Sequence, residues 1–318
     1  MLRSFFIYLS KASWAQNWIM RLPFAWRMAS RFVAGTAKED AIRVIRELNA
    51  RGINATLDHL GEHTTNVEEA LEATRHILEI LEEIERAAVR SNVSIKLTQI
   101  GLALDTELCA ENLERILRQA QAHNNFVRID MEDTPYTDAT FDLYRRMRQR
   151  GFQNFGLVIQ SYLYRSEDDV RRLLPEGVPI RLVKGAYKEP PDKAFPKKAD
   201  VDANYDLLTK LLLDASLSQS SRLSADGRFP PLAAIATHDE KRIEFARRYA
   251  ERIGLPKEGL EFQMLYGIRR DLQERLAAEG YPVRVYVPYG THWYPYFMRR
   301  LAERPANVWF LLSNLLRG

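Results

Sequence analysis

Short apolar segments alternate with longer segments of helical character along most of the chain. Eight of the short segments are rich in β-branched and other apolar residues and are bounded by polar or turn residues, a pattern typical of buried strands. These predicted strands lie at residues 54–58, 92–98, 126–132, 155–160, 180–185, 232–237, 260–265 and 283–288.

The segments between them predict helices. Residues 67–90, 199–217 and 239–254 carry apolar side chains at helical spacing, with charged side chains on the remaining positions. Strands that alternate with helices indicate a parallel sheet. In a chain of 318 residues, eight such units favour an α/β fold with a (β/α)8 TIM barrel, and a doubly wound open sheet is the second candidate. We expect an N-terminal helical segment at 1–37 and a catalytic barrel at 38–318.

The first 35 residues combine many aromatic side chains with Arg and Lys, and the first acidic residue is Glu39. This composition fits a helical layer that covers the domain, which we favour, or an amphipathic segment in contact with a membrane. No stretch of about 18 uncharged apolar residues is present, so no membrane-spanning helix is predicted.

The charge balance is only mildly basic, with 46 Lys and Arg against 42 Asp and Glu. A net charge of +4 suits anionic ligands or an anionic membrane surface and does not by itself indicate a nucleic acid, so no nucleic-acid partner is predicted. The single cysteine, Cys109, precludes an internal disulfide and fits a reducing, cytoplasmic location.

Two long loops flank predicted strands. Residues 185–202, rich in Pro and Lys, follow the fifth strand and would lie at the face of a barrel that carries active sites, so they are a candidate lid. Residues 218–231 precede the sixth strand, and we expect them to be surface at the opposite face.

Polar and charged residues interrupt the apolar pattern near the carboxyl ends of five predicted strands. A buried charge needs a partner or a ligand, and barrel enzymes keep their active sites at this end of the strands. The residues are Lys96, Asp130, Gln160, Arg181, Lys184, Thr237 and His238.

Three functions could use this set. Lys96 or Lys184 could form a Schiff base, as in an aldolase. Cations exceed carboxylates in this part of the sequence, which favours instead an enzyme for an anionic ligand, either a carboxylate substrate or a phosphorylated cofactor. A non-catalytic barrel that binds anionic metabolites at a membrane is the third possibility.

Metal and nucleotide motifs give no support for other chemistry. His59 and His63 have a spacing that aligns two ligands only on a helix, whereas Gly61 between them indicates a loop, so no metal site is predicted. Neither a G-x-G-x-x-G nor a P-loop sequence is present.

The segment 293–305, WYPYFMRRLAERP, predicts a helix after the last strand. Tyr296, Arg299 and Arg300 are spaced so that they share one face. Two adjacent guanidiniums are suited to bidentate recognition of a carboxylate. We therefore expect this helix to lie over the barrel mouth.

Several motifs together resemble the proline dehydrogenase family. They are LDHLGE at 57–62, SIKLTQIG at 94–101, RIDMED at 128–133, LVIQSYLYR at 157–165, RLVKGAY at 181–187, ATHD at 236–239, FQMLYG at 262–267 and YVPYGTHWYPYFMRRLAE at 286–303. The resemblance extends from about Lys38 to Glu303, and the length resembles that of the monofunctional bacterial enzymes.

This resemblance implies a distorted (β/α)8 barrel that binds FAD without a Rossmann motif. The implied reaction oxidises L-proline to Δ1-pyrroline-5-carboxylate by hydride transfer from proline C5 to FAD N5, as the first step of proline catabolism. It further implies that electrons leave to a membrane quinone, which would give the N-terminal segment a reason to contact the inner face of the bacterial membrane.

The resemblance also implies roles for individual residues. The predicted ligands of the proline carboxylate are Lys96, Arg299 and Arg300. The residues predicted to wall the ring are Leu182, Tyr187, Tyr286 and Tyr296. Tyr296 favours proline over hydroxyproline, because a smaller residue is expected there in enzymes for the hydroxylated substrate.

Two catalytic roles are implied, with Asp130 holding Lys96 and the ring geometry, and Arg181 placed near flavin N5. Glu62 is predicted to pair with the first arginine as a gate over the site. The positions that match FAD contacts are Met131, Gln160, Arg181, Lys184, Gly185, Ala186, Thr237 and His238.

Overall fold

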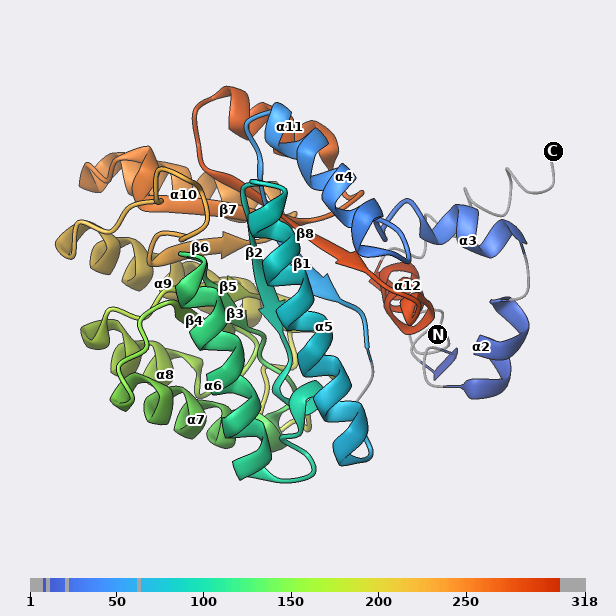
Figure 1. The fold of residues 1–318 in the computed structure, drawn as a ribbon. Helices are drawn as coiled ribbons and strands as arrows, with labels where there is room; N and C mark the ends of the chain where they lie inside the picture. The colour runs from blue at the N-terminus through green and yellow to red at the C-terminus, as the bar shows by residue number, and fades with distance from the viewer. Residues whose placement is uncertain (1–7, 10–11, 21–22, 62–63, 304–318) are drawn as a thin grey trace.

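The eight predicted strands form a closed barrel. The computed structural model describes residues 8–9, 12–20, 23–61 and 64–303. Within them, eight parallel strands follow one another around the barrel in chain order, so the predicted barrel is confirmed and the open sheet is wrong (Figure 1). The strands are β1 (Asn54–His59), β2 (Ser91–Ile95), β3 (Val127–Ile129), β4 (Phe155–Gln160), β5 (Ile180–Val183), β6 (Ala233–Ala236), β7 (Leu260–Leu265) and β8 (Val283–Tyr289).

Helices surround the barrel and connect successive strands. The surrounding helices are α4 (Lys38–Ala50), α5 (Val67–Arg86), α6 (Thr106–Ala122), α7 (Thr137–Gln149), α8 (Ser166–Leu173), α9 (Lys198–Ser218), α10 (Glu240–Ile253) and α11 (Arg270–Ala278). Short 3-10 turns are η1 (Leu97–Ile100), η2 (Thr134–Tyr136), η3 (Leu174–Glu176) and η4 (Lys257–Gly259). Asn66, Asp105 and Asp239 cap α5, α6 and α10 by accepting hydrogen bonds from first-turn amides, which fixes where these helices begin.

The barrel separates an apolar shell from a polar interior. On β1, Ala55 and Leu57 belong to the main apolar core, whereas the alternating Thr56 and Asp58 are hydrogen-bonded to side chains of β2 and its end. Successive side chains of a strand face opposite sides, so one set packs against the helices and the other points into the barrel. The interior positions therefore supply polar groups for a site.

The loop at 218–231 corrects a prediction, because it is more than surface. Arg284 donates from Nη2 to the Gly227 carbonyl at 2.6 Å, and Asn92 donates from Nδ2 to the Arg228 carbonyl at 2.8 Å. The ring of Phe229 lies 5.8 Å from that of Phe126. Since these partners lie at the beginnings of β8, β2 and β3, the loop closes the amino-terminal end of the barrel.

Three further helices make a second apolar cluster beside the barrel. These are α2 (Ser13–Ile19), α3 (Pro23–Ala29) and α12 (Trp293–Glu303), grouped beyond the end of β8 in Figure 1. Trp26 of α3 meets Trp293 of α12 edge-on at 5.5 Å, and Leu60 after β1 joins the same cluster. The N-terminal helices thus cover α12 rather than the body of the barrel.

The segment after α3 is tied to the end of β8 by main-chain hydrogen bonds. Ala34 N donates to the Pro288 carbonyl at 2.9 Å, and Gly290 N donates to the Gly35 carbonyl at 3.0 Å. Gly267, after β7, has φ of +76°, and a Cβ there would lie 1.7 Å from the Arg31 carbonyl oxygen. The absence of a side chain at residue 267 therefore permits this segment to dock.

We predict that Gly267→Ala detaches the N-terminal segment. Gly254→Ala is the matched control, because Gly254 has φ of +72° and nothing lies within 4 Å of its added Cβ. Both variants carry the conformational cost of positive φ, roughly 1–2 kcal/mol, but only Gly267→Ala adds a main-chain clash. Thermal unfolding and limited proteolysis should show a larger stability loss and faster cleavage before residue 34 for Gly267→Ala. Equal behaviour of the two variants would contradict this docking.

Candidate functional site

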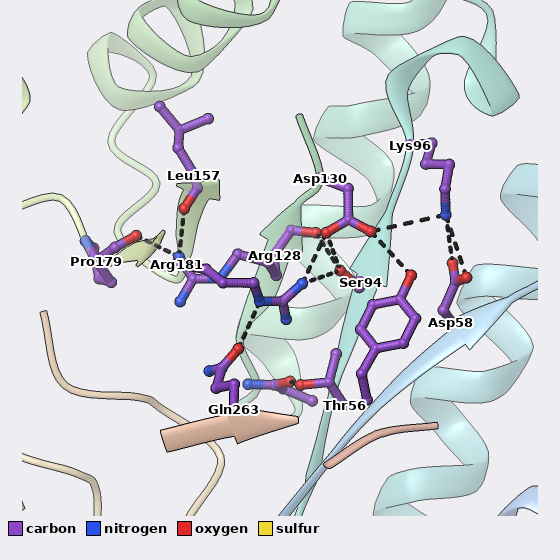
Figure 2. A network of polar contacts seen from close by, with 12 residues as sticks. Thr56, Asp58, Ser94, Lys96, Arg128, Asp130, Leu157, Pro179, Arg181 and Gln263 are labelled. Atoms are coloured by element: carbon purple, nitrogen blue, oxygen red, sulfur yellow. Dashed lines mark hydrogen bonds and ion pairs between the residues drawn. The ribbon is translucent and has the colours of Figure 1, made fainter. Parts of the chain in front are cut away.

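Lys96 and Asp58 form an ion pair at the carboxyl ends of β2 and β1. Lys96 Nζ donates to Asp58 Oδ1 at 3.0 Å and Oδ2 at 3.2 Å, while the Lys96 side chain remains 22% exposed (Figure 2). Burial opposes the ammonium charge, but Asp58 and then Asp130 raise the pKa of Lys96 above its usual value. Burial raises the pKa of Asp58, and Lys96 partly offsets this effect. Lys96 therefore stays protonated at neutral pH.

Asp58 is a site residue that the sequence reasoning missed. It ends the first predicted strand, NATLD, so the rule that identified charges near strand ends could have included it. Its side chain is only 2% exposed, and a charge this deeply buried requires a partner. Asp58 is the closest anionic partner of Lys96, a role that the sequence had assigned to Asp130.

Asp130 connects four other groups in the barrel interior. Its Oδ1 lies 2.8 Å from Arg181 Nη1 and accepts a 2.8 Å hydrogen bond from Ser94 Oγ. Its Oδ2 accepts from the Tyr286 hydroxyl at 3.0 Å and lies 3.8 Å from Lys96 Nζ. Figure 2 shows this carboxylate between the Lys96 and Arg181 side chains. Asp130 thus holds Arg181 and Tyr286 directly and meets Lys96 only at ion-pair distance.

The guanidinium of Arg181 is held at two of its three nitrogens. Nε donates to Gln263 Oε1 at 2.6 Å, and Nη1 donates to Asp130 and to Ser94 Oγ at 3.2 Å. Its plane is further limited by the Tyr286 ring, whose centroid lies 5.4 Å from Cζ. Among the side chains and main chain that the structure describes, no acceptor engages Nη2. That nitrogen is the donor through which Arg181 could meet a ligand.

The strand-end cations Lys96, Arg181 and Lys184 each have a carboxylate partner, so the predicted excess of cations over carboxylates is wrong for these three. Arg128 on β3 is a further cation in the barrel interior. Its Nη1 donates to the Leu157 carbonyl at 2.8 Å and to the Pro179 carbonyl, and within the described residues it forms no ion pair. Burial, followed by the nearby Arg181 charge, lowers the pKa of Arg128. Arg128 is only 1% exposed, so it lies too deep to contact a ligand directly.

The positions assigned to a cofactor gather at the ends of three neighbouring strands. Gln160 ends β4, Lys184 to Ala186 follow β5, and Thr237 and His238 follow β6, in a sheet where β4 pairs with β5 and β5 with β6. Thr237 Oγ1 accepts from Asp239 N at 3.1 Å, and His238 Nε2 accepts from Leu265 N at 3.0 Å. Gln160 Nε2 donates to the Glu132 carbonyl at 3.0 Å.

Two of these positions have close partners within the protein. Lys184 Nζ lies 2.5 Å from Asp202 and 2.7 Å from Asp239, so two carboxylates already neutralise its charge. Gly185 has φ of +115°, and a Cβ there would lie 2.2 Å from the Tyr162 ring. Close packing on Tyr162 therefore suffices to require glycine at this position.

Leu182 and Met131 lie in the apolar core. Leu182 follows Arg181 on β5, is fully buried, and belongs to the shell side of the barrel because adjacent strand residues face opposite sides. The Tyr205 hydroxyl of α9 donates to the Leu182 carbonyl at 3.1 Å. The position of Leu182 thus does not support the prediction that it walls the substrate. Met131 directly follows the site residue Asp130, so its main chain lies beside the site.

The α12 residues lie at the same end of the barrel as these groups. Arg299 is exposed, and the Cζ of the half-buried Arg300 lies 4.9 Å from the centroid of the buried Tyr296 ring. Burial and Glu132 raise the pKa of Tyr187 to about 12, while the charges of Lys96 and Arg299 oppose that rise. The charges of Arg299 and Lys96 therefore both lower the pKa of the Tyr187 hydroxyl. Glu62, the predicted gate, lies outside the described residues.

The candidate lid, residues 185–202, is held across the barrel mouth by hydrogen bonds. Glu189 accepts from Thr134 N at 2.9 Å and from Thr134 Oγ1 at 2.5 Å, which joins the loop after β5 to the turn after β3. The last residues of the predicted loop, 198–202, belong instead to α9. The position of Tyr187, two residues before Glu189, is thereby restricted to the barrel mouth.

His59 is half-buried at the end of β1 beside His76, with ring centroids 4.7 Å apart. Burial, followed by the His76 charge, lowers the pKa of His59 to about 4, so it is neutral at pH 7. Within the described ranges no group of three or more potential ligands could hold a metal ion, and His63 lies outside them.

Comparisons with known proteins identify the chain's relatives. A family model described as Proline dehydrogenase matches residues 41–312. Proline dehydrogenase 2 of Bacillus subtilis (strain 168) is 40% identical over 320 residues, which cover 99% of this chain and 99% of the relative. The proline dehydrogenase of Deinococcus radiodurans is 41% identical over 297 residues, covering 92% of this chain and 91% of the relative.

Solved structures agree with these relatives. The crystal structure of proline utilization A from Bdellovibrio bacteriovorus, inactivated by N-propargylglycine, matches with a TM-score of 0.78 at 27% identity. The match covers 87% of this chain and 32% of that longer one.

Proposed function

The chain belongs to the proline dehydrogenase family, and we propose that it oxidises L-proline to Δ1-pyrroline-5-carboxylate with FAD as its cofactor. Proline oxidation is the first step of proline catabolism, and membership of the family supports this activity. One observation carries the proposal for this site: Asp130 lies between Lys96, on the substrate side, and Arg181, beside the strands assigned to the cofactor.

Three cations would bind the proline carboxylate. An ammonium has three N–H donors, and since Asp58 engages two from Lys96, the third can serve a ligand. Arg299 and Arg300 extend from α12 and would supply the forked donors that a carboxylate accepts in pairs. The charge of Arg299 already acts on Tyr187, which supports a common site for α12 and the barrel.

The apolar ring would lie among Tyr187, Tyr286 and Tyr296. Tyr286 is oriented by its hydrogen bond to Asp130, and Tyr296 is buried beneath Arg300. Because Arg181, Ser94 and Tyr286 all use the Asp130 carboxylate, its proposed role is to position these groups.

FAD fits the cluster of residues at the ends of β4, β5 and β6. When bound, FAD accepts a hydride equivalent at N5. Arg181 would place a fixed positive charge beside that ring through Nη2, and a nearby cation raises a flavin's reduction potential by stabilising negative charge on the reduced form. Gln160, Ala186, Thr237, His238 and the main chain after Met131 would hold the ring and the rest of the cofactor. Lys184 would contribute indirectly, by fixing Asp202 and Asp239.

The Schiff-base alternative has little physical support. A lysine must be neutral to attack a carbonyl, yet Asp58 and Asp130 raise the pKa of Lys96, and Asp202 and Asp239 raise that of Lys184, in both cases against the effect of burial. Both amines are therefore protonated at neutral pH.

A membrane quinone is the proposed electron acceptor, with the N-terminal segment as the membrane contact. No helix among the described residues is long and apolar enough to cross a bilayer. Trp14 and Trp18 of α2, spaced four apart, are 64% and 68% exposed, and Tyr8 is also exposed. Exposed aromatic side chains in a segment that carries only basic charges before Glu39 suit an anionic membrane surface.

The activity is tested by the flavin itself. Protein purified in the presence of FAD should show a flavin absorption band, and excess L-proline under anaerobic conditions should bleach it. Trapping with borohydride and a keto acid should give no adduct at Lys96 or Lys184. A colourless protein that forms such an adduct would support the Schiff-base function instead.

We predict that Arg299→Met raises the proline KM by at least about tenfold, because a charge-assisted hydrogen bond contributes roughly 1.5–3 kcal/mol. Flavin content should not change. Arg300→Met should raise KM similarly and also lower the melting temperature, since this side chain packs over Tyr296.

The control for both variants is Arg248→Met, an exposed arginine on α10. Steady-state kinetics for Arg248→Met should match those of the wild type. A normal proline KM in both α12 variants would exclude α12 from binding the carboxylate.

Membrane contact predicts that the double variant Trp14→Ser/Trp18→Ser loses most of its cosedimentation with vesicles rich in phosphatidylglycerol. Removing two interfacial aromatic side chains lowers the apolar area that can enter the headgroup region. Leu71→Ser/Leu217→Ser removes exposed apolar residues from α5 and α9 and should bind like the wild type. Undiminished binding of the tryptophan variant would rule out this surface.

A further inference from the structure

Arg181 is the end of a continuous line of buried hydrogen bonds that begins at the closed end of the barrel. Arg284 Nε lies 2.8 Å from Glu261 Oε1, Gln263 Nε2 donates to the same oxygen at 2.6 Å, and Gln263 Oε1 accepts from Arg181 Nε at 2.6 Å. Glu261 is fully buried and Arg284 is 1% exposed. Neither Glu261 nor Gln263 is among the residues proposed to contact proline or FAD.

The Glu261 carboxylate determines the orientation of the Gln263 amide. An amide presents a donor at one end and an acceptor at the other, whereas an ionised carboxylate can only accept. The NH2 group must therefore face Glu261, and the carbonyl oxygen is directed at Arg181. If the amide were reversed, two donors would meet at Arg181 and two acceptors at Glu261.

Arg284 holds the Glu261 carboxylate in place. Its Nε and Nη2 bind the two carboxylate oxygens, the latter at 3.0 Å, and its remaining donors bind the Ala55 carbonyl at 2.7 Å and the Gly227 carbonyl at 2.6 Å. A bidentate arginine partner fixes the geometry of a buried carboxylate. The line is thus anchored in main chain at its Arg284 end.

We propose that Glu261 and Gln263 are positioning residues for the redox step. They hold the plane of the Arg181 guanidinium so that its Nη2 faces the bound flavin, while Asp130 holds the opposite edge. The proposal rests on the proposed function, because it assumes that Arg181 acts on FAD. It assigns these residues to the flavin's potential and reduction rate and not to proline binding.

The test compares Gln263→Met with a control of the same chemistry. Gln263→Met removes the acceptor for Arg181 Nε. Gln273→Met removes an equally buried glutamine on α11, whose amide donates to the Leu265 and Ile268 carbonyls outside the barrel interior. Both variants should lose thermal stability. Only Gln263→Met should lower the flavin midpoint potential and slow anaerobic flavin reduction by proline on the order of tenfold, with a proline dissociation constant near that of the wild type.

A second variant covers the case in which Gln263→Met fails to fold. Gln263→Ala leaves the Glu261–Arg284 and Asp130–Arg181 ion pairs intact and makes room for water at the polar groups that it frees. It should fold and bind flavin but lower the flavin potential and the rate of flavin reduction, because Arg181 Nε loses its fixed acceptor.

The outcomes separate this inference from the proposed function. Bound flavin in every variant, with potentials and reduction rates equal to those of the wild type, would overturn the positioning role and leave proline oxidation standing. Equal losses of flavin potential and reduction rate in Gln263→Met and Gln273→Met would mean that Gln263 contributes only to stability. That result would also overturn the positioning role. A wild-type protein without flavin would overturn both.

Discussion

The Asp130–Arg181 ion pair is the interaction on which the arrangement of the site depends. A carboxylate and a guanidinium buried in one barrel must satisfy each other, since an isolated charge there would cost several kcal/mol. Asp130 also orients Tyr286 and lies at ion-pair distance from Lys96. One carboxylate therefore fixes the separation between a cation suited to a substrate and a cation suited to a cofactor.

This constraint explains why the barrel interior is polar from end to end. The apolar sets of β1 and β5 pack against helices, and the alternating interior positions form linked pairs that extend down to Glu261 and Arg284. Such a network is rigid because each group's donors and acceptors are directed by the next. A preorganised site of this kind orients charge before the ligand arrives, which is how electrostatic catalysis avoids reorganisation during the reaction.

The substrate side is built differently from the cofactor side. The proposed cofactor positions lie on strand ends, whereas the arginines proposed to bind the carboxylate lie on α12, which packs with α2 and α3 in a cluster of its own. Burial against the N-terminal helices, the ties from residues 34 and 35 to β8, and the Glu189–Thr134 contact together determine where α12 and Tyr187 lie relative to the barrel. A change in any of these contacts should therefore affect the proposed substrate-binding residues more than the proposed cofactor positions.

The sequence alone determined the eight strands and the polar residues at strand ends, because apolar periodicity and the charges that interrupt it are local properties. It favoured closure into a barrel over an open sheet, and the structure decided between them. The sequence could not determine partners. Asp58 as the partner of Lys96, Asp202 and Asp239 as those of Lys184, and Leu182 in the shell follow from which strands adjoin and which side each residue faces. The loop at 218–231 likewise reads as surface until the fold brings it against Arg284. Pairing among buried charges is a long-range property, so only the tertiary structure could decide it.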